Sequence, residues 1–179
     1  MILCAGNNET FPFATSIGVG LIQSSINFTK LCLTNKPDSV TFIGSAGSYG
    51  NHDIFDIVQS SSASNIELSF LSDDSYTPLN NIIENINIQT EVTTIVNSSN
   101  YITTNMKLAK KFTKFNISIE NMEFFSLCTV AQEFNIPISG IFVITNYTNK
   151  DAHKDFIKNH KIALDHLIKH ISKKNIIKS

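Results

Sequence analysis

The sequence predicts an α/β fold with a mixed, largely parallel central sheet flanked by helices. Two observations carry this prediction: short apolar runs alternate with longer segments of helical periodicity, and several of the apolar runs have no polar face. A strand that is apolar throughout is covered on both sides, as the strands of parallel sheets are. At 179 residues, with 42% hydrophobic and 16% charged residues, the chain is expected to form a single domain over residues 1–179.

The expected strands are short runs rich in Val, Ile and Phe. They are residues 2–5, 40–43, 54–58, 91–96, 117–119 and 138–144. A further strand-like piece, 66–70, stands inside a Ser/Asn/Asp-rich stretch over 60–85 that predicts a long surface loop.

Four segments have the spacing of apolar residues that is typical of helices. They are residues 21–33, 105–115, 122–134 and 151–172. The first has Ile22, Ile26, Thr29 and Leu33 at helical spacing. The last has Phe156, His160, Ala163, Leu167 and Ile171 on its inner face.

Composition excludes several classes of function. A net charge of -1 gives no electrostatic basis for binding nucleic acid or an acidic membrane surface. No apolar run approaches the ~20 residues of a membrane span, and no signal peptide is evident, so a cytoplasmic protein is expected. Three cysteines without a C-x-x-C motif indicate buried free thiols. No cofactor is implied, and His166 with His170 lacks the third ligand of a metal site.

Met122 and Glu123 stand at the start of the third predicted helix. A carboxylate can accept hydrogen bonds from both hydroxyls of a ribose, and a methionine can lie against the flat face of the sugar. The alternative is that Glu123 only caps the helix or compensates its dipole.

Asn146 follows Thr145 at the end of the last predicted strand. It is either a turn residue or a purine ligand. An amide can donate to N7 or O6 of a purine and accept from N1–H, but it cannot deliver a proton. Asn146 therefore favours a 6-oxopurine, whose departure would be stabilised by hydrogen bonding.

Two glycine-rich segments, 18–20 and 44–48, follow predicted strands or precede helices. The second is predicted to be a tight turn, and backbone N–H groups in such a turn can hold an anion or a water. The chain contains no Arg, so any phosphate site must manage without a guanidinium fork.

Together these segments resemble the purine nucleoside phosphorylase and nucleosidase superfamily, as a short bacterial-type member, over roughly residues 16–58 and 92–165. The family's Glu-Met-Glu segment is matched by Asn121-Met122-Glu123, which keeps the ribose glutamate. Thr145-Asn146 matches the Thr-Asn of trimeric purine nucleoside phosphorylases, where most nucleosidases have Ser-Asp. The resemblance implies the family's three-layer α/β fold.

The resemblance also implies roles for other residues. Gly18 and Gly20, with Gly44, Ser45 and Gly47, would hold phosphate or the nucleophilic water. Tyr101 and Ile102 would line the base pocket, although Tyr101 suits an ordinary surface position equally well. His160 would contact the ribose 5′-hydroxyl, or it would simply lie at the edge of the hydrophobic core. Glu9 lies near the place where nucleosidases keep an acid–base glutamate.

The expected function is cleavage of the N-glycosidic bond of a purine nucleoside, with phosphate as the expected acceptor, by a homo-oligomer with shared sites. Glu123 would orient the ribose and Asn146 would stabilise the departing base. Two alternatives stay open. The missing arginines favour a nucleosidase that uses water, while Asn121 and a short N-terminal region, which could lack part of the nucleophile site, suggest a degenerate nucleoside-binding protein.

Overall fold

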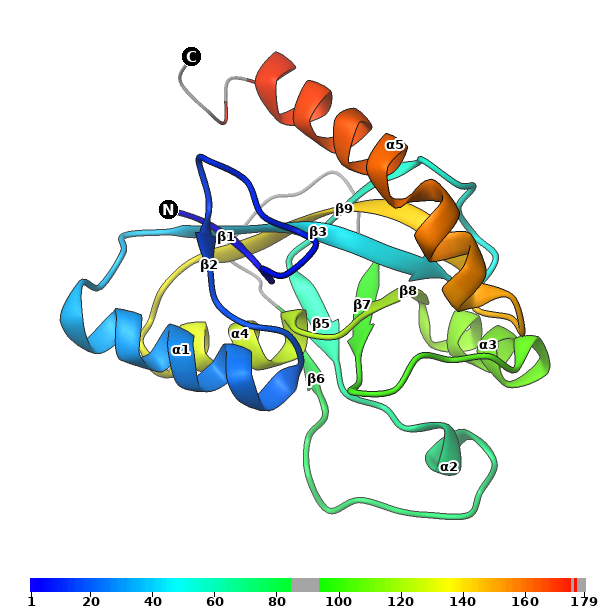
Figure 1. Ribbon diagram of the computed structural model, residues 1–179. Coiled ribbons are helices and arrows are strands. Elements are labelled where there is room, and N and C mark those ends of the chain that lie inside the picture. Colours follow the sequence, from blue (N-terminus) through cyan, green and yellow to red (C-terminus); the bar gives the residue numbers. More distant parts are fainter. Residues whose placement is uncertain (85–93, 175, 177–179) are drawn as a thin grey trace.

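The computed structural model describes residues 1–84, 94–174 and 176, which form a mixed, largely parallel sheet between helical layers (Figure 1). The strands are β1 (Ile2–Cys4), β2 (Thr15–Ser16), β3 (Val40–Ser48), β4 (Ile57–Ser60), β5 (Ser62–Ser64), β6 (Ile82–Ile83), β7 (Ile95–Ser98), β8 (Ile117–Asn121) and β9 (Ile138–Tyr147). The helices are α1 (Leu21–Thr34), α2 (Leu68–Leu71), α3 (Met106–Phe112), a 3-10 turn η1 (Thr113–Phe115), α4 (Phe124–Glu133) and α5 (Ala152–Lys173).

Strand β3 is the centre of the sheet and sets the position of the site. It pairs in parallel with β1 and along its whole length with β9, whose register shifts between Ala46 and Gly47. Its last residues also pair with β8, which runs antiparallel. The carboxyl ends of β3 and β9 therefore meet β8 at one edge of the sheet, which is where α/β folds commonly bind ligands.

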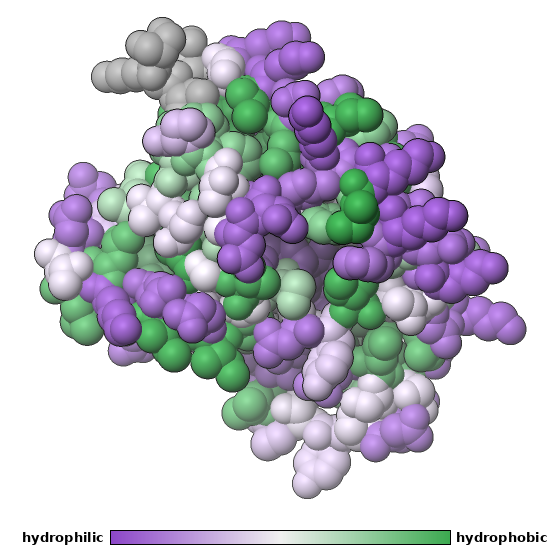
Figure 2. Space-filling model, in the orientation of Figure 1, coloured by the Kyte–Doolittle hydropathy of each residue, from purple (hydrophilic) through white to green (hydrophobic). Residues whose placement is uncertain are grey.

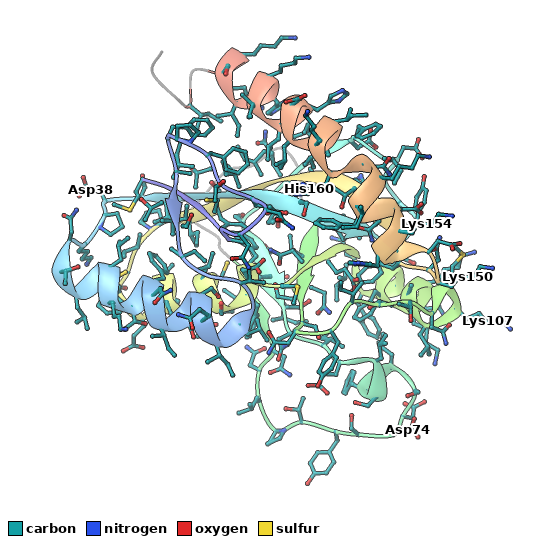
Figure 3. The ribbon with its side chains drawn as sticks, in the orientation of Figure 1. Asp38, Asp74, Lys107, Lys150, Lys154 and His160 are labelled. Atoms are coloured by element: carbon teal, nitrogen blue, oxygen red, sulfur yellow. The ribbon has the colours of Figure 1, made fainter. Side chains whose placement is uncertain are left out.

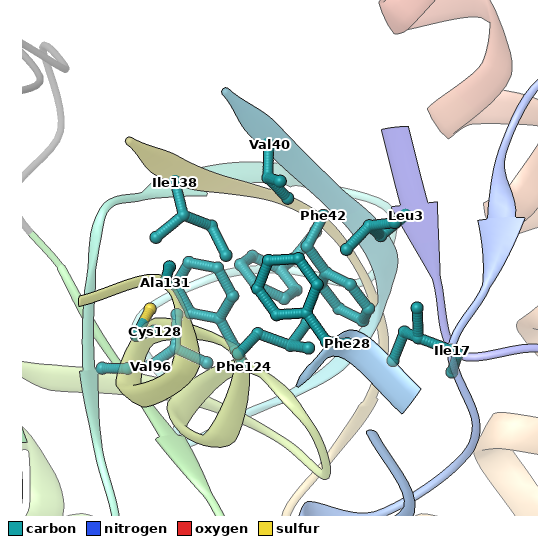
Figure 4. Packing of buried hydrophobic residues seen from close by; sticks show 14 of the residues in the cluster. Leu3, Ile17, Phe28, Val40, Phe42, Val96, Phe124, Cys128, Ala131 and Ile138 are labelled. Carbon is teal, nitrogen blue, oxygen red and sulfur yellow. The ribbon is translucent and has the colours of Figure 1, made fainter. Parts of the chain in front are cut away.

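One face of the sheet packs on α1 and α4 around four phenylalanine rings (Figure 4). Phe42 and Phe142 from the sheet meet Phe124 from α4 and Phe28 from α1, and all four are fully buried. Gly140 makes room for this cluster, because a Cβ there would lie 2.4 Å from the ring of Phe142.

The other face of the sheet is covered by α5 (Figure 1). Ile43, next to Phe42 in β3, points to this side, as the alternation of a strand requires. It packs with Val143 of β9 and with three buried residues of the helix: Ala163, Leu167 and Ile171. The inner face predicted for the last helix is thus confirmed at those positions.

Three predicted elements need correction. The predicted turn at 44–47 is the end of strand β3, because β9 pairs with it along this stretch. The strand-like piece at 66–70 contains the short helix α2 instead. The strand predicted over 54–58 begins only at Ile57, after Phe55 takes a positive φ of 76°. Residues 91–93 of the predicted 91–96 strand lie outside the described residues.

Helix α1 forms as predicted, but its apolar residues face two ways. Phe28 and Cys32 are buried, whereas Ile22 and Leu33 are 69% and 72% exposed. Figure 2 shows the resulting apolar surface over α1, at the lower left of the view. Across residues 1–84 and 94–174, no helix has both the length and the apolar composition needed to cross a membrane.

Candidate active site

A cavity of about 290 Å³ opens where β3, β8 and β9 come together. The loop after β1, the residues before α1, the chain between β7 and α3, and the first turn of α5 complete its walls. The predicted site residues that line it are Glu9, Ser45, Gly47, Tyr101, Ile102, Met122, Glu123 and Asn146. Segments far apart in the sequence therefore converge on one cavity, as the predicted site requires.

Glu123 stands at the N-terminus of α4, yet its side chain makes no capping bond to that helix. The amide of Asn121 caps the helix instead, because its Oδ1 accepts from the N–H of Phe124 at 3.1 Å. The Glu123 carboxylate accepts from the N–H of Gly20 at 2.9 Å and from the N–H of Met122 at 3.2 Å. The capping interpretation of Glu123 is therefore wrong. The Nδ2 of Asn121 also donates to Oε2 of Glu123 at 3.2 Å, so Oε1 is the oxygen with acceptor capacity left for a bound molecule.

The environment of Glu123 disfavours its charge. Burial raises the pKa of Glu123 to about 7, the charge of nearby Glu9 raises it further, and the N–H of Gly20 opposes both effects. Glu123 therefore changes charge near neutral pH, where an ordinary glutamate is ionised.

Gly20 is suited to this contact because its φ of 83° is a left-handed conformation that glycine adopts without strain. Its N–H was expected to meet phosphate or water, together with Gly18. The structure instead directs the N–H of Gly20 to the Glu123 carboxylate. The segment 18–20 thus orients a carboxylate rather than lying open to an anion.

Glu9 lies against the glycine-rich end of β3. Both of its carboxylate oxygens accept from the N–H of Ser45, at 3.2 and 3.3 Å, and its Oε1 also accepts from the Ser45 hydroxyl. Gly44 permits this approach, because a Cβ there would lie 2.8 Å from Oε2 of Glu9. The short N-terminal region therefore does carry an acid to the predicted nucleophile site.

His160 of α5, which is labelled in Figure 3, lies near the same carboxylate. Its Nε2 lies 3.7 Å from Oε1 of Glu9 and has no hydrogen-bond partner, and its ring lies against Phe156 with centroids 4.7 Å apart. His160 lies beside Glu9 and is not among the residues that line the cavity. It is therefore not placed for the predicted contact with a ribose 5′-hydroxyl inside the cavity.

Asn146 is buried in the cavity wall, where β9 pairs with Gly47 of β3. Its Oδ1 accepts from the Thr145 hydroxyl at 2.8 Å, and its Nδ2 donates to the carbonyl of Tyr147 at 3.3 Å. Asn159 of α5 holds the Thr145 carbonyl at 2.9 Å. The orientation of the amide is thereby set, with one N–H of Nδ2 left over.

Tyr101 and Ile102 lie at the rim of the cavity rather than inside it. Tyr101 is 84% exposed, and Ile102 is exposed as well. Met122 is half-buried and lines the same cavity.

One buried acid of the cavity wall was not predicted. Glu120, in β8, accepts from the Tyr49 hydroxyl at 2.8 Å and from the N–H of Thr103 at 2.9 Å, and burial raises its pKa. The sequence signal was a single glutamate directly after the strand residues Ile117, Ser118 and Ile119. The pairing of β8 with β3 places it opposite Gly47 at the cavity. Within residues 1–84 and 94–174, no cluster of His, Cys, Asp or Glu could hold a metal ion.

Known structures share this fold. A 5′-methylthioadenosine nucleosidase of Helicobacter pylori, solved as a mutant with 5′-methylthioadenosine, is 18% identical, with a TM-score of 0.74 and coverage of 96% of this chain and 97% of that one. A futalosine hydrolase mutant of Helicobacter pylori is 17% identical, with a TM-score of 0.73 and the same two coverages. The Streptococcus pneumoniae MTA/SAH nucleosidase is 14% identical, with a TM-score of 0.69 and coverages of 93% and 95%.

No curated protein matches the sequence. The family model of the phosphorylase superfamily matches residues 5–173, which include every element from the Glu9 loop to α5. This match agrees with the resemblance carried by Met122-Glu123 and Thr145-Asn146. The chain therefore belongs to the phosphorylase superfamily.

Proposed function

We propose that this protein is a purine nucleosidase, which cleaves the N-glycosidic bond of a purine nucleoside with water. The single observation that carries this proposal is the carboxylate of Glu9 on Ser45. The N–H and hydroxyl donors that a phosphate would need are already occupied by an anion. A second anion there would be repelled, whereas a carboxylate beside a water is a general base.

Two further observations support water over phosphate as the acceptor. The chain has no Arg to neutralise a phosphate. The proteins of similar fold named above are two nucleosidases and a hydrolase. Phosphorolysis, which the family name led us to expect, would require phosphate to displace the Glu9 carboxylate from Ser45.

The reaction follows from the positions of three side chains. A water beside Glu9 gives a proton to that carboxylate while its oxygen bonds to C1′ of the ribose. The C1′–N9 bond breaks, its electron pair passes to the purine, and the purine takes a proton from solvent. Asn146 donates a hydrogen bond to the departing base, and ionised Glu123 accepts from the ribose hydroxyls, which holds C1′ toward the water.

Three finer features belong to the same proposal. Asn146 in place of an acid favours a 6-oxopurine nucleoside, such as inosine or guanosine. The exposed apolar residues of α1 favour a homo-oligomer. The three buried free cysteines suit the reducing conditions of the cytoplasm.

The test uses purified protein with inosine, guanosine or adenosine, in buffers with and without phosphate. We expect free base and free ribose without phosphate. Glu9→Gln removes the base that accepts the water proton, so we expect kcat to fall by about 10²–10⁴-fold. Glu67→Gln, an exposed residue outside the cavity, is the matched control and should leave kcat unchanged. Binding of nucleosides without release of base would instead support the degenerate nucleoside-binding protein.

A further inference from the structure

The carboxylate of Glu9 lies between two residues that take no part in the proposed reaction. Gly44 of β3 faces one oxygen, because a Cβ there would lie 2.8 Å from Oε2. His160 of α5 faces the other oxygen, with its Nε2 3.7 Å from Oε1. We call this space between Gly44 and His160 the Glu9 slot.

The two oxygens of Glu9 are not equivalent. Oε1 accepts from the N–H of Ser45 at 3.2 Å and also from the Ser45 hydroxyl. Oε2 accepts only from the same N–H, at 3.3 Å. A carboxylate oxygen has two lone pairs, so both lone pairs of Oε1 are used and Oε2 keeps capacity for one more hydrogen bond. Oε2 can therefore accept a proton from water while Oε1 stays on Ser45.

The backbone of Glu9 is fixed by a tight turn. The N–H of Glu9 donates to the carbonyl of Gly6 at 2.9 Å, and the carbonyl of Glu9 accepts from the N–H of Gly6 at 3.3 Å. Asn7, inside the turn, has a positive φ of 53°. The carboxylate can therefore move only by rotation of its own side chain, and the two walls of the slot limit that rotation.

The His160 wall of the slot is anchored. Asn159, the preceding residue, donates to the carbonyl of Thr145 at 2.9 Å, and the His160 ring lies against Phe156. Among the described residues, the buried Nε2 of His160 has no hydrogen-bond partner. A buried ring nitrogen without a partner costs free energy that a phenylalanine would avoid. Packing alone therefore does not account for a histidine at this position.

A histidine differs from a phenylalanine here because its ring edge can donate a hydrogen bond. In the neutral tautomer that carries the hydrogen on Nε2, this nitrogen is a donor directed at Oε1. If Oε1 rotates away from the Ser45 hydroxyl, Nε2–H is the next donor on that side. Oε1 is thus engaged in either position, and Oε2 stays the oxygen with free capacity.

We propose that Gly44 and His160 are positioning residues, which fix the Glu9 carboxylate so that Oε1 is committed to structural hydrogen bonds and Oε2 is the oxygen that takes the proton from water. The inference rests on the proposed function, since it names the basic oxygen of the same site. Gly44 gives Oε2 its place, and His160 keeps Oε1 from leaving Ser45 for any position without a donor.

The test is a double-substitution cycle with inosine as substrate. Gly44→Ala places a Cβ against Oε2, so we expect kcat to fall by about 100-fold while KM stays within about 2-fold. His160→Ala opens the other side of the slot, so the carboxylate can give way. In that background we expect Gly44→Ala to lower kcat by less than about 10-fold.

His170→Ala is the matched control, because His170 lies on the same helix and contacts Gln59 instead of Glu9. In the His170→Ala background, Gly44→Ala should keep its full effect on kcat. An equal loss of kcat in the His160→Ala and His170→Ala backgrounds would overturn the slot.

Failure of the proposed function is distinguishable from failure of this inference. If wild-type protein releases no base from any nucleoside, urea unfolding of wild type, the two single variants and the double variant still measures the contact. We expect Gly44→Ala to lower the unfolding midpoint and most of that fall to be absent in the His160→Ala background. The same fall in both backgrounds would contradict the slot, whatever the reaction.

Discussion

At the scale of single residues, the cavity gives three carboxylates three environments. Glu9 accepts from the N–H and hydroxyl of Ser45 and lies beside His160. Glu123 is buried beside that charge, and its pKa of about 7 follows from burial first. Glu120 is buried between a phenol and a backbone amide. Because their neighbours differ, we propose different roles for two of these carboxylates: Glu9 as the general base and Glu123 as the ribose ligand.

The pKa of Glu123 predicts a pH dependence of substrate binding. Below about pH 7 the carboxyl is protonated and loses part of its capacity to accept from the ribose hydroxyls. We expect KM for inosine to rise as the pH falls from 8 to 5.5, while Glu123→Gln has a high KM that is flat with pH. Measurements of KM across this range, with kcat followed separately, test it; a flat wild-type KM would contradict the role of Glu123.

His160 is predicted to be a positioning residue that acts through Glu9. Its Nε2 lies 3.7 Å from Oε1 of Glu9, the oxygen that accepts from the Ser45 hydroxyl, so the ring limits where that carboxylate can move. We expect His160→Gln to lower kcat by about 10-fold and to leave KM within 2-fold. His170→Gln, on the same helix and in contact with Gln59, is the control. A fall in kcat accompanied by a comparable rise in KM would indicate a merely structural role.

At the scale of elements, the parallel pair of β3 and β9 determines where the candidate site is formed. Its carboxyl end carries Gly44, Ser45 and Gly47 on one strand and Asn146 on the other. The predicted tight turn failed here because glycines and a serine carry weak strand propensity, while the flanking strands β8 and β9 supply the hydrogen bonds. Tertiary pairing outweighed local preference.

The packing of β9 on α4 gives a stability prediction. Gly140→Ala would place a Cβ 2.4 Å from Phe142 and 3.0 Å from Phe124. We expect this overpacking to lower the free energy of unfolding by about 1–3 kcal/mol. Ser139→Ala, next in the strand and partly exposed, should change it by less than about 0.5 kcal/mol. Urea unfolding of wild type, Gly140→Ala and Ser139→Ala measures the free energy of unfolding of each protein. Equal midpoints would show that the phenylalanine rings move aside without cost, which would contradict the prediction.

At the scale of the whole molecule, the sequence predicted the order and type of the main elements well. The alternation of apolar strands and amphipathic helices predicted the fold class, and the segments Met122-Glu123 and Thr145-Asn146 both lie at the candidate cavity. Local patterns could not show that Glu120 faces Gly47 across two strands, or that His160 turns toward Glu9. Those contacts depend on pairs 73 and 151 residues apart, which no local periodicity encodes.

The apolar surface of α1 predicts self-association. Ile22 and Leu33 are 69% and 72% exposed on helix α1, which begins directly after Gly20, the residue whose N–H contacts Glu123. Exposed apolar patches on a folded protein mark association surfaces. We expect wild-type protein to sediment as a dimer or larger and the pair Ile22→Lys with Leu33→Lys to shift toward monomer. Lys30→Glu on the same helix is a control for charge alone. A monomeric wild type at micromolar concentration would contradict the prediction.

We propose that Glu9 activates a water molecule. The identity of the sugar product shows whether water or phosphate accepts the ribosyl group. Purified protein is incubated with inosine in buffer freed of phosphate and in buffer with phosphate, and the sugar product is identified in each. We predict that hypoxanthine and free ribose form at the same rate in both buffers and that Glu9→Gln lowers this rate by about 10²–10⁴-fold. Release of base only with phosphate, accompanied by ribose 1-phosphate, would contradict it.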